Sequence, residues 1–301
     1  MVIGLPKIRL IMGKIIFITG PTASGKSDLA IWLAKKINGE IINADSRQVY
    51  KYLDIGSGKI EDDKGIKHYL LSIASPKKNY SLGRWLKDVD ISIKKILKKG
   101  KIPIICGGTI LYLKALKEGW ILPNVGPDYR LRKRLEKLDN ETLYKKLLKL
   151  DKRRAKELGK ENKRRLIRAL EIAIKLGKIP KLKKRKKYEI LILAPYIEFS
   201  KLEKKIYKRL LKRVDGIIKE IKKLRKIGLS FKRIISFGLE YEWFGKYLLE
   251  DGDLNYYIER CYLDIRRFAR KQIRELNKIK EVNWIKDKND AIKLVKNFLH
   301  L

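Results

Sequence analysis

The chain has 301 residues, 45% of them hydrophobic, which is enough for a substantial core in one large domain or two smaller ones. No apolar run reaches the roughly 18–20 residues needed to span a membrane, and residues 1–13 lack the long apolar region and cleavage site of a signal peptide. We therefore expect a cytoplasmic location without a membrane partner; Met12, just before the first predicted strand, is an alternative natural start. Cys106 and Cys261 form no C-x-x-C pair, which excludes a cysteine-rich zinc module.

The charge is strongly basic, with 74 Lys and Arg against 34 Asp and Glu and a formal net charge of +40. Such an excess predicts a polyanionic partner, although a biased composition such as that of proteins from hot environments would also produce one. The distribution favours the partner. Residues 130–187 contain 25 basic and 7 acidic residues, a net charge of +18, where uniform spreading would give about +8.

In the first third, apolar β-branched runs alternate with helical stretches. Strands are predicted at residues 15–19, 40–44, 68–73 and 103–106, and helices at 26–37, 81–99 and after Thr109 to about Lys117. This alternation is typical of a parallel sheet covered by helices on both faces. We therefore predict an α/β fold with a P-loop NTPase-like parallel sheet flanked by helices.

The pattern changes after residue 123. Residues 128–177 have Leu at helical spacing and end before a basic run at 178–187, so 124–187 reads as a helical insertion domain. The core is then residues 1–123 together with 188–301. The elements expected in its second part are a strand at 188–195, one long amphipathic helix from about 198 to 228, helices at 238–250 and 254–279, and a short strand at 282–285.

Residues 14–27, KIIFITGPTASGKS, are the most informative stretch. They combine a strand, a G-x-x-x-x-G-K-S loop and a helix, the context of a phosphate-binding loop whose N–H groups face an anion. Lys26 adds a charge at the outer phosphates, and the Ser27 hydroxyl can hold Mg²⁺. The pattern is that of nucleotide-binding and ATP-binding proteins, but a diphosphate on any organic group would suit it. The predicted phosphate-binding residues are Gly20, Pro21, Thr22, Ala23, Ser24, Gly25, Lys26 and Ser27.

Two further segments follow parallel strands and should lie at the same sheet edge: ADSRQVY at 44–50 and GGT at 107–109. Asp45 could hold magnesium through water, accept a proton as a general base, or cap a helix. Gly107-Gly108 could be a simple tight turn, and DIGSGK at 54–59 a surface loop. No other apolar strand ends in Asp or Glu, which disfavours a motor ATPase and leaves small-metabolite kinases open.

These motifs in this order, GPTASGKS, ADSRQVY, LDIGSGK, CGGTILYLKAL and RRLIRALEI, resemble the tRNA dimethylallyltransferase (tRNA isopentenyltransferase) family over residues 14–285. The resemblance implies an enzyme that moves a dimethylallyl group from dimethylallyl diphosphate, with magnesium, to the exocyclic amine of the adenosine 3′-adjacent to the anticodon. Diphosphate is released, and the phosphate loop binds the prenyl donor rather than ATP. The implied partners are tRNA, through its anticodon stem-loop, and the prenyl donor; a monomer is expected.

The resemblance also implies roles for particular residues. The DSRQ motif, which contacts the flipped adenosine, falls on Asp45, Ser46, Arg47 and Gln48, and the threonine of the GGT motif falls on Thr109. Further tRNA contacts fall on Arg130 and on the segment Arg164, Arg165, Leu166, Ile167 and Arg168.

The chemistry agrees with this assignment. An adenine amine is a weak nucleophile that must leave the base stack, and a carboxylate beside it can accept its proton. Asp45 is the predicted base and Thr109 its catalytic partner. A cationic allylic carbon would gain from an aromatic wall; Tyr112 and Trp243 are candidates, with a place in the core as the competing expectation for each.

The chain departs from the family pattern in several places. Ile60 stands where a proline is usual, Ser72 where an aspartate is frequent, and Ile235 where some members have a diphosphate-binding arginine, for which Arg233 is a substitute candidate. The pattern R-Q-x-A-K-R-Q-x-T-W is met only partly at residues 266–275, without the tryptophan. His68 matches a family histidine, for which we expect buried hydrogen bonding.

Two other functions stay open. A free adenylate (AMP or ATP) isopentenyltransferase would share the loop but has little need of the basic insertion. A small-molecule kinase or an ATP-dependent RNA-binding protein would show phosphoryl transfer or ATP hydrolysis.

Overall fold

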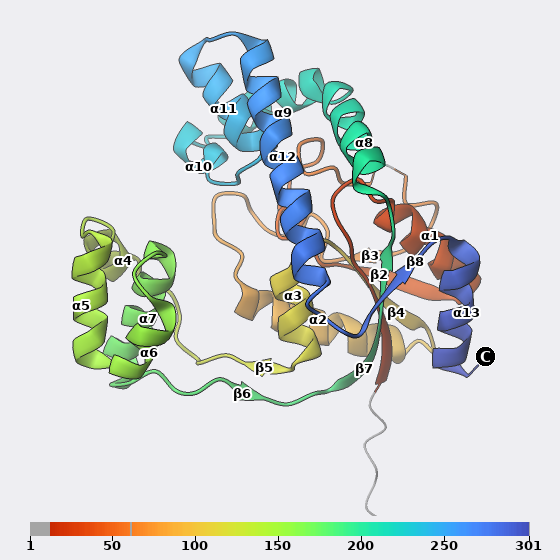
Figure 1. Ribbon diagram of the computed structural model, residues 1–301, viewed down its shortest axis with the longest axis horizontal. Helices are drawn as coiled ribbons and strands as arrows, with labels where there is room; N and C mark the ends of the chain where they lie inside the picture. The colour runs from red at the N-terminus through yellow and green to blue at the C-terminus, as the bar shows by residue number, and fades with distance from the viewer. Residues whose placement is uncertain (1–12, 61, 301) are drawn as a thin grey trace, which may run out of the picture. The chain divides into compact units, whose positions relative to one another are not determined.

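A single parallel sheet forms the centre of the larger part of the chain (Figure 1). The computed structural model describes residues 13–60 and 62–300, so the alternative start at Met12 lies outside the described residues. The sheet has the order β3-β2-β4-β1-β7-β8, and every pairing in it is parallel. Its strands are β1 Gly13–Ile18, β2 Gly39–Asn43, β3 His68–Tyr69, β4 Ile102–Cys106, β7 Tyr188–Pro195 and β8 Val282–Ile285. The predicted α/β fold class is confirmed.

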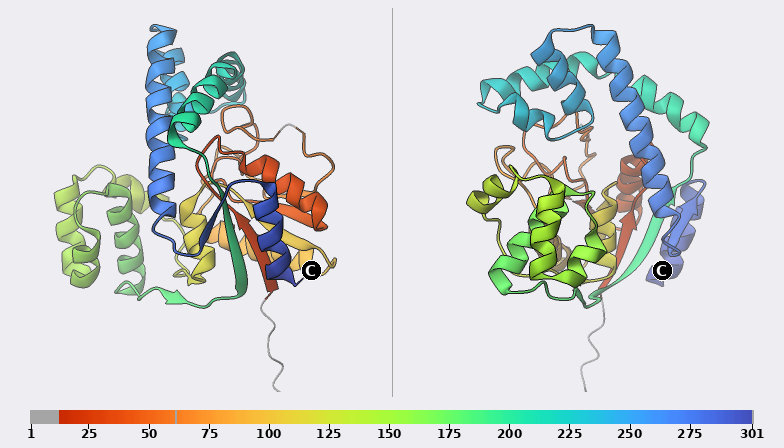
Figure 2. Two further views of the ribbon diagram at one scale, coloured as in Figure 1. Left: turned by 45° about the vertical axis from the view of Figure 1, so that its right-hand side comes forward. Right: turned by 60° about the vertical axis from the view of Figure 1, so that its left-hand side comes forward.

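Side chains of β1 alternate between two buried faces, as they must in a strand covered on both sides. Ile15 and Phe17 pack on one face, against α2 Leu82–Leu97 and α3 Ile110–Lys117. Ile16 and Ile18 pack on the other, against α1 Lys26–Lys36 and α13 Lys288–Leu299. Figure 2 shows both layers. The sheet therefore holds the loops at its carboxyl edge on a rigid base.

Among the described residues, no helix is long and apolar enough to cross a membrane.

A helical cluster with its own core follows β7. It contains α8 Phe199–Leu211, α9 Val214–Lys226, α10 Phe231–Ile235, α11 Glu240–Glu250 and α12 Leu254–Leu276. The prediction of one long helix to residue 228 is wrong, because the helix breaks at Lys212 and Arg213. The Arg213 guanidinium reaches the carbonyl groups of Ile55 and Gly56, so this break connects the helices to the loop at 54–59. The short α10 and the C-terminal α13 were not predicted.

The predicted strand at 68–73 is also too long, since β3 contains only His68 and Tyr69. Leu70 and Ser72 have φ angles of 59° and 54°, which a strand cannot accommodate. The Asn43 side chain donates a hydrogen bond to the Leu70 carbonyl over 3.1 Å and stabilises the turn. The chain therefore leaves the sheet after Tyr69 and continues as a turn.

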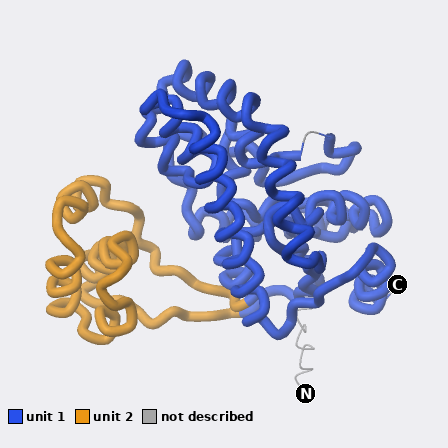
Figure 3. The backbone as a smooth tube through the Cα atoms, turned by 45° about the horizontal axis from the view of Figure 1, so that its top comes forward, with its two compact units in different colours: residues 1–117, 186–301 blue, residues 118–185 orange. Residues whose placement is uncertain are grey.

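Residues 118–185 form a second compact unit, distinct from residues 1–117 and 186–301 (Figure 3). Four helices, α4 Tyr129–Leu135, α5 Asn140–Leu150, α6 Lys152–Leu158 and α7 Lys163–Leu176, bury a core of their own. Each begins at a side chain that accepts a backbone N–H bond, the preferred N-cap arrangement: Asp128, Asp139, Asp151 and Asn162. An antiparallel pair, β5 Trp120–Ile121 with β6 Lys183–Lys184, joins the two ends of the unit.

Candidate active site

The phosphate loop lies between β1 and α1 and has the conformation that its glycines permit. Gly20 and Gly25 have φ angles of 141° and 84°, and Ala23 has 62°. Gly25 is the N-cap of α1, and it has no side chain that could accept a hydrogen bond from the first N–H groups of the helix. Such an N-terminus binds an anion through its N–H groups and its dipole.

Lys26 lies within this loop, where its ammonium group donates a 2.6 Å hydrogen bond to the Pro21 carbonyl. Burial lowers the pKa of Lys26 to about 8. The group is therefore only partly stabilised in its charged form, and an added anion would supply the missing counter-charge.

The loop opens onto a cavity of about 550 Å³ whose lining is strongly basic. Its cations are Lys26, Lys59, Lys205 and Arg209. Arg209 of α8 also lines the adjoining cavity, and its guanidinium has no hydrogen-bond partner among the described residues. Burial and the neighbouring Arg213 lower the pKa of Arg209. This half-buried cation, which has no hydrogen-bond partner among the described residues, was missed from the sequence because the long-helix prediction gave no reason to single it out.

Arg233, the predicted substitute for a diphosphate-binding arginine, lies elsewhere. Its guanidinium donates to the carbonyl groups of Pro76 and Lys78 and to Asn79, and it lines no cavity at the phosphate loop among the described residues. Arg233 is therefore not placed to contact an anion at the phosphate loop, whereas Arg209 lines the cavity there.

Asp45 follows β2 and shares the cavity with Lys26 and Thr22. One carboxylate oxygen, Oδ1, accepts N–H bonds from Arg47 and Gln48 at 2.8 and 3.3 Å. The other, Oδ2, has no hydrogen-bond partner among the described residues. No helix follows Asp45, so the predicted helix cap is absent; the carboxylate instead stabilises a turn at residues 46–49, and Oδ2 stays available to accept a proton.

Thr109 fixes the relative position of the two strand ends. Its hydroxyl oxygen accepts a 3.0 Å bond from the Ser46 N–H, and its own N–H donates to the Ala44 carbonyl at 3.3 Å. This approach requires glycine at 107, since a Cβ there would lie 2.2 Å from the Ala44 carbonyl carbon. Gly107 and Gly108 line the cavity, whereas Thr109 stands one step behind them.

The other residues of the DSRQ motif hold neighbouring elements. Arg47 Nε donates to the Phe237 carbonyl at 2.6 Å, and Gln48 donates to the carbonyl groups of Ser57 and Gly58. Both side chains line the cavity, and Ser46 is exposed. The motif therefore connects β2 to the loop at 54–59.

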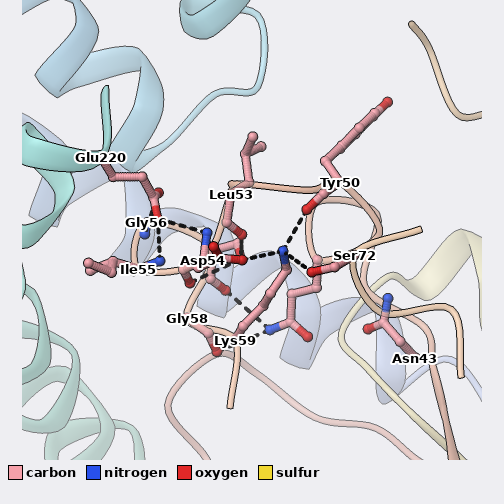
Figure 4. Close-up of polar contacts among 12 residues, drawn as sticks. Asn43, Tyr50, Leu53, Asp54, Ile55, Gly56, Gly58, Lys59, Ser72 and Glu220 are labelled. Atoms are coloured by element: carbon pink, nitrogen blue, oxygen red, sulfur yellow. Dashed lines mark hydrogen bonds and ion pairs between the residues drawn. The ribbon is translucent and has the colours of Figure 1, made fainter. Parts of the chain in front are cut away.

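That loop is firmly anchored (Figure 4). Glu220 of α9 accepts N–H bonds from Asp54, Ile55 and Gly56 at 2.8, 2.6 and 3.1 Å. Lys59 donates to the Tyr50 carbonyl, Asp54 and the Ser72 hydroxyl at 2.5, 2.6 and 2.8 Å, and burial lowers its pKa. The expected surface loop is therefore a fixed wall of the cavity, with Ser72 serving where the family often has an aspartate.

Gln272 of α12 is the glutamine of the partly matched pattern at 266–275, to which the sequence analysis assigned no role. Its buried amide accepts the Thr22 N–H at 2.9 Å and donates to the Gly108 carbonyl at 2.9 Å. One side chain thus holds the phosphate loop against the Gly-Gly turn.

Neither of the two residues predicted to form an aromatic wall, Tyr112 and Trp243, lines the cavity. Tyr112 stacks on Trp85 in the core, with ring centroids 4.2 Å apart, and Trp243 donates to Asp264. The aromatic residue that lines the cavity is Phe268 of α12, with Leu239 and Ile265 beside it. His68 also lines the cavity, and its Nδ1 lies 2.8 Å from the Ile66 carbonyl.

In the second unit, the predicted RNA-binding residues divide by burial. Arg130, Arg164 and Arg165 are exposed. Arg168 binds Glu171 and the Val125 carbonyl, while Leu166 and Ile167 are buried in the core. Because the side chains of Leu166 and Ile167 pack in this core, we expect the arginines of the segment to make its contacts with RNA.

The donor set suits magnesium on a bound diphosphate. Among the described residues, no group of three or more His, Cys, Asp or Glu side chains forms a metal site of its own. The exposed Ser27 hydroxyl lies at the start of α1 and lines the basic cavity. One protein oxygen together with ligand phosphates and water is the usual way in which Mg²⁺ binds at phosphate sites.

Comparison with known proteins gives one consistent family. The IPP transferase model matches residues 48–278, and an isopentenyl transferase model matches residues 13–72. The chain is 37% identical to a tRNA dimethylallyltransferase of Acetivibrio thermocellus, over 95% of this chain and 96% of that protein. A second relative, from Pelotomaculum thermopropionicum, has the same name and is 36% identical over 92% of each chain.

Solved structures agree. A tRNA isopentenylpyrophosphate transferase from Bacillus halodurans matches with a TM-score of 0.70 and 31% identity, over 95% of each chain. A eukaryotic dimethylallyltransferase acting on tRNA matches with a TM-score of 0.75 and 29% identity, over 87% of this chain and 69% of that one. The chain therefore belongs to the IPP transferase family, together with these tRNA dimethylallyltransferases.

Proposed function

We propose that this protein transfers a dimethylallyl group from dimethylallyl diphosphate to the exocyclic amine of the adenosine 3′-adjacent to the anticodon of a tRNA, releasing diphosphate. The observation that carries the proposal is the shared cavity. The phosphate loop and the Asp45 carboxylate both line it, so that a leaving diphosphate and an incoming amine can meet between them. The names of the relatives support the choice of donor and acceptor.

At the donor end, the chain supplies the charge that a departing diphosphate needs. The first N–H groups of α1, Lys26 and Arg209 surround the basic cavity. Magnesium, when bound at Ser27, would add positive charge to the same oxygens. Charge that develops on the leaving group is therefore met by donors already in place.

At the acceptor end, Asp45 has the geometry of a general base. Its Oδ1 is fixed by two N–H groups, so Oδ2 can accept a proton as the carbon–nitrogen bond forms. Thr109 acts through Ser46 and the Gly-Gly turn, which hold this end of β2. The adenine must first leave its stack, at a cost of a few kcal/mol.

We further propose that the basic helical insertion, predicted at 124–187, contacts the anticodon stem-loop through Arg130 of α4 and through Arg164 and Arg165 of α7, with Arg168 positioning α7. Exposed arginines near a nucleic-acid substrate bind phosphates without reading sequence. We also propose that the protein acts on tRNA in the cytoplasm and as a monomer.

The test is direct. Purified protein, dimethylallyl diphosphate and Mg²⁺ are mixed with an anticodon stem-loop bearing adenosine at the 3′-adjacent position, and the RNA is analysed by mass spectrometry. We expect one dimethylallyl group per RNA, and no product when inosine, which lacks the amine, replaces that adenosine. Asp45→Ala should lower turnover by about 10²–10⁴-fold. Failure to modify any of several such RNAs would contradict the proposal.

Free adenylate is the second candidate acceptor, since the isopentenyl transferase model that matches residues 13–72 specifies no acceptor by its name. An assay in which AMP and RNA compete for the donor distinguishes the two acceptors. If excess AMP fails to reduce RNA modification and yields no prenylated AMP, RNA is the substrate. Prenylation of AMP in preference to RNA would favour the alternative.

A further inference from the structure

Glu240 is a buried carboxylate at the candidate active site, and the proposed reaction assigns it no role. It stands at the start of α11 and is 8% exposed. It lines the cavity that Lys26 and Asp45 share, and also a smaller cavity of about 10 Å³ that is lined by Arg209 and Arg213. A buried carboxylate is unfavourable unless cations or hydrogen bonds compensate it, so its neighbours indicate what it does.

The neighbours of Glu240 are cations rather than groups that fix its geometry. Among the described residues, its carboxylate accepts no hydrogen bond. Its Oε1 lies 3.7 Å from Arg213 Nη2, which is close enough for an ion pair but too far for a hydrogen bond. The same Nη2 donates instead to the carbonyl groups of Ile55 and Gly56. Glu240 therefore contributes negative charge here, while other groups hold the arginine in position.

The two arginines are close neighbours. A Cβ at Gly58 would lie 2.0 Å from Arg209 Nη2 and 3.5 Å from Arg213 Nη1, so both guanidinium groups lie against this glycine. Burial and the charge of Arg213 lower the pKa of Arg209, and the charge of Glu240 acts in the opposite direction. Among the described residues, the Arg209 guanidinium has no hydrogen-bond partner, and neither has the buried Arg213 Nε. Two neighbouring cations thus share the negative charge of Glu240.

The backbone that leads to Glu240 is strained. Leu239 has φ 49° and ψ −124°, a conformation that a leucine rarely adopts, and Gly238 before it has a φ of 73°. Strain of this kind is concentrated at functional sites, where the surrounding structure holds it in place. Here the strained pair starts α11 at Glu240 and so places the carboxylate beside the arginines.

A role in helix α11 alone would not require this burial. An acidic side chain in the first turn stabilises a helix even when it is exposed, and Glu242 in the same turn pairs with Lys246 at 2.8 Å. Glu240 instead lies among cations that a bound diphosphate would also use. Because like charges repel, a carboxylate beside these cations lowers their affinity for a second anion.

We propose that Glu240 is the internal counter-charge of Arg209 and Arg213, and that it keeps the affinity for diphosphate low enough for the product to leave. It acts through the two arginines and is a positioning residue rather than a catalytic one. The proposal rests on the proposed function, since diphosphate is the product of that reaction.

The test compares two variants with the same charge change on one helix. Glu240→Gln removes the counter-charge and keeps the size of the side chain. The control is Glu242→Gln, because Glu242 pairs with Lys246 and lines neither of the cavities that Glu240 lines. Calorimetry without RNA measures the Kd of diphosphate with Mg²⁺ and the Kd of dimethylallyl diphosphate. The inhibition constant of diphosphate during RNA prenylation and the free energy of unfolding are measured alongside.

For Glu240→Gln, we expect diphosphate to bind about 10–100-fold more tightly, since removal of a unit charge near a partly buried anion has an effect of this order. The Kd of dimethylallyl diphosphate and the inhibition constant of diphosphate should fall in the same direction. Glu242→Gln should change each value less than about threefold, because solvent screens this partly exposed pair. Glu240→Asp, which keeps the charge, should bind diphosphate within about threefold of the wild-type protein.

An unchanged or raised Kd for diphosphate in folded Glu240→Gln would overturn the proposal, because a purely structural role can weaken binding but gives no reason for it to tighten. Equal tightening in Glu242→Gln would overturn it too, since only net charge would then matter. If Glu240→Gln fails to fold, Glu240→Met, which keeps the length of the side chain without its polar end, decides by the same Kd. Tighter diphosphate binding by Glu240→Gln, with a wild-type protein that prenylates no RNA, would refute the proposed function and leave the effect of Glu240 on the anion site standing.

Discussion

Two opposing influences act on the pKa of Lys26. Burial lowers its pKa to about 8, whereas a bound diphosphate would favour the charged form and raise it. Above pH 8 the free protein therefore loses a proton that the complex keeps, so binding must take that proton up. We expect the Kd for dimethylallyl diphosphate to rise by up to about tenfold per pH unit above pH 8.

Calorimetry between pH 7 and pH 10 without RNA measures this slope, because the phosphates of the ligand finish ionising below the window. Lys26→Met should bind more weakly at pH 7 and show no such slope. A wild-type Kd that is flat across the window would contradict the assignment. The sign for stability is the reverse: the unfolded chain keeps its proton to a higher pH, so the stability of the free protein rises from pH 8 to about 10.5.

Gln272 should control the geometry of the donor site without touching the chemistry. Its amide accepts from Thr22 and donates to Gly108, so Gln272→Glu would place a carboxylate against a carbonyl oxygen. We expect Gln272→Glu to lower kcat/KM by about 10–100-fold, a loss of roughly 1.4–2.8 kcal/mol in transition-state stabilisation. The KM for dimethylallyl diphosphate should rise more than the KM for RNA.

Lys271→Glu provides the matched charge change one residue away, on the exposed side of α12. It should leave the KM for dimethylallyl diphosphate unchanged. If Gln272→Glu alters neither KM nor kcat while both proteins stay folded, the residue has no positioning role.

The residues of the phosphate loop and Asp45 could be predicted because each stands in a short motif next to a strand. Arg209 could not, and Gln272 was matched within the pattern at 266–275 but without a role. They lie in basic helices rich in similar residues, and only the tertiary fold shows which face meets the loop. Asp45 shows another limit: the sequence left a helix cap and a general base as alternatives, and the structure has a turn in place of the helix, with Oδ2 available.

Among the elements, the loop at 54–59 depends most on distant parts of the chain. Glu220 of α9 accepts three of its N–H groups and the Tyr241 hydroxyl. Glu220→Gln would replace an acceptor oxygen by an NH₂ group facing N–H donors. We expect a loss of about 2–3 kcal/mol in the free energy of unfolding, measured with urea. Glu259→Gln, an exposed change on α12, should alter it by less than about 0.5 kcal/mol. Equal losses would show that the anchor contributes nothing specific.

The same loop explains where element prediction failed. The amphipathic pattern at 198–228 continues through Lys212 and Arg213, so periodicity alone gives one helix. The break exists because Arg213 must reach the carbonyl groups of residues 55 and 56, a contact across more than 150 residues. β3 ended early for a similar reason, since the side chain of Asn43 holds the Leu70 carbonyl in a turn. Long strands and capped helices, by contrast, carry their signals locally.

At the scale of the whole molecule, the two units are separate in packing. The three core clusters of residues 13–117 and 186–300 contain no described residue from 118–185, and the fourth cluster lies wholly within that range. Each unit can therefore keep its core without side chains from the other. This separation assigns the donor site to the larger unit alone, since its lining residues all lie there.

The antiparallel pair of β5 and β6 offers a clean way to remove the smaller unit. Trp120 pairs with Lys184 and Ile121 with Lys183, so an Asn-Gly turn can join Ile121 directly to Lys183 in place of residues 122–182. We expect the shortened protein to fold, to unfold cooperatively, and to bind dimethylallyl diphosphate within about threefold of the full chain, because it keeps all three core clusters of the larger unit and every donor-site residue.

Prenylation of the anticodon stem-loop should fall by at least about 10²-fold, since exposed arginines of the removed unit would no longer bind phosphates. Binding of the donor is measured by calorimetry and transfer by mass spectrometry of the RNA. Unchanged transfer to RNA would contradict a role for the basic unit in substrate binding. Retained transfer to AMP with loss of transfer to RNA would show that the unit selects the polymer rather than assembling the catalytic groups, which places chemistry in one unit and recognition in both.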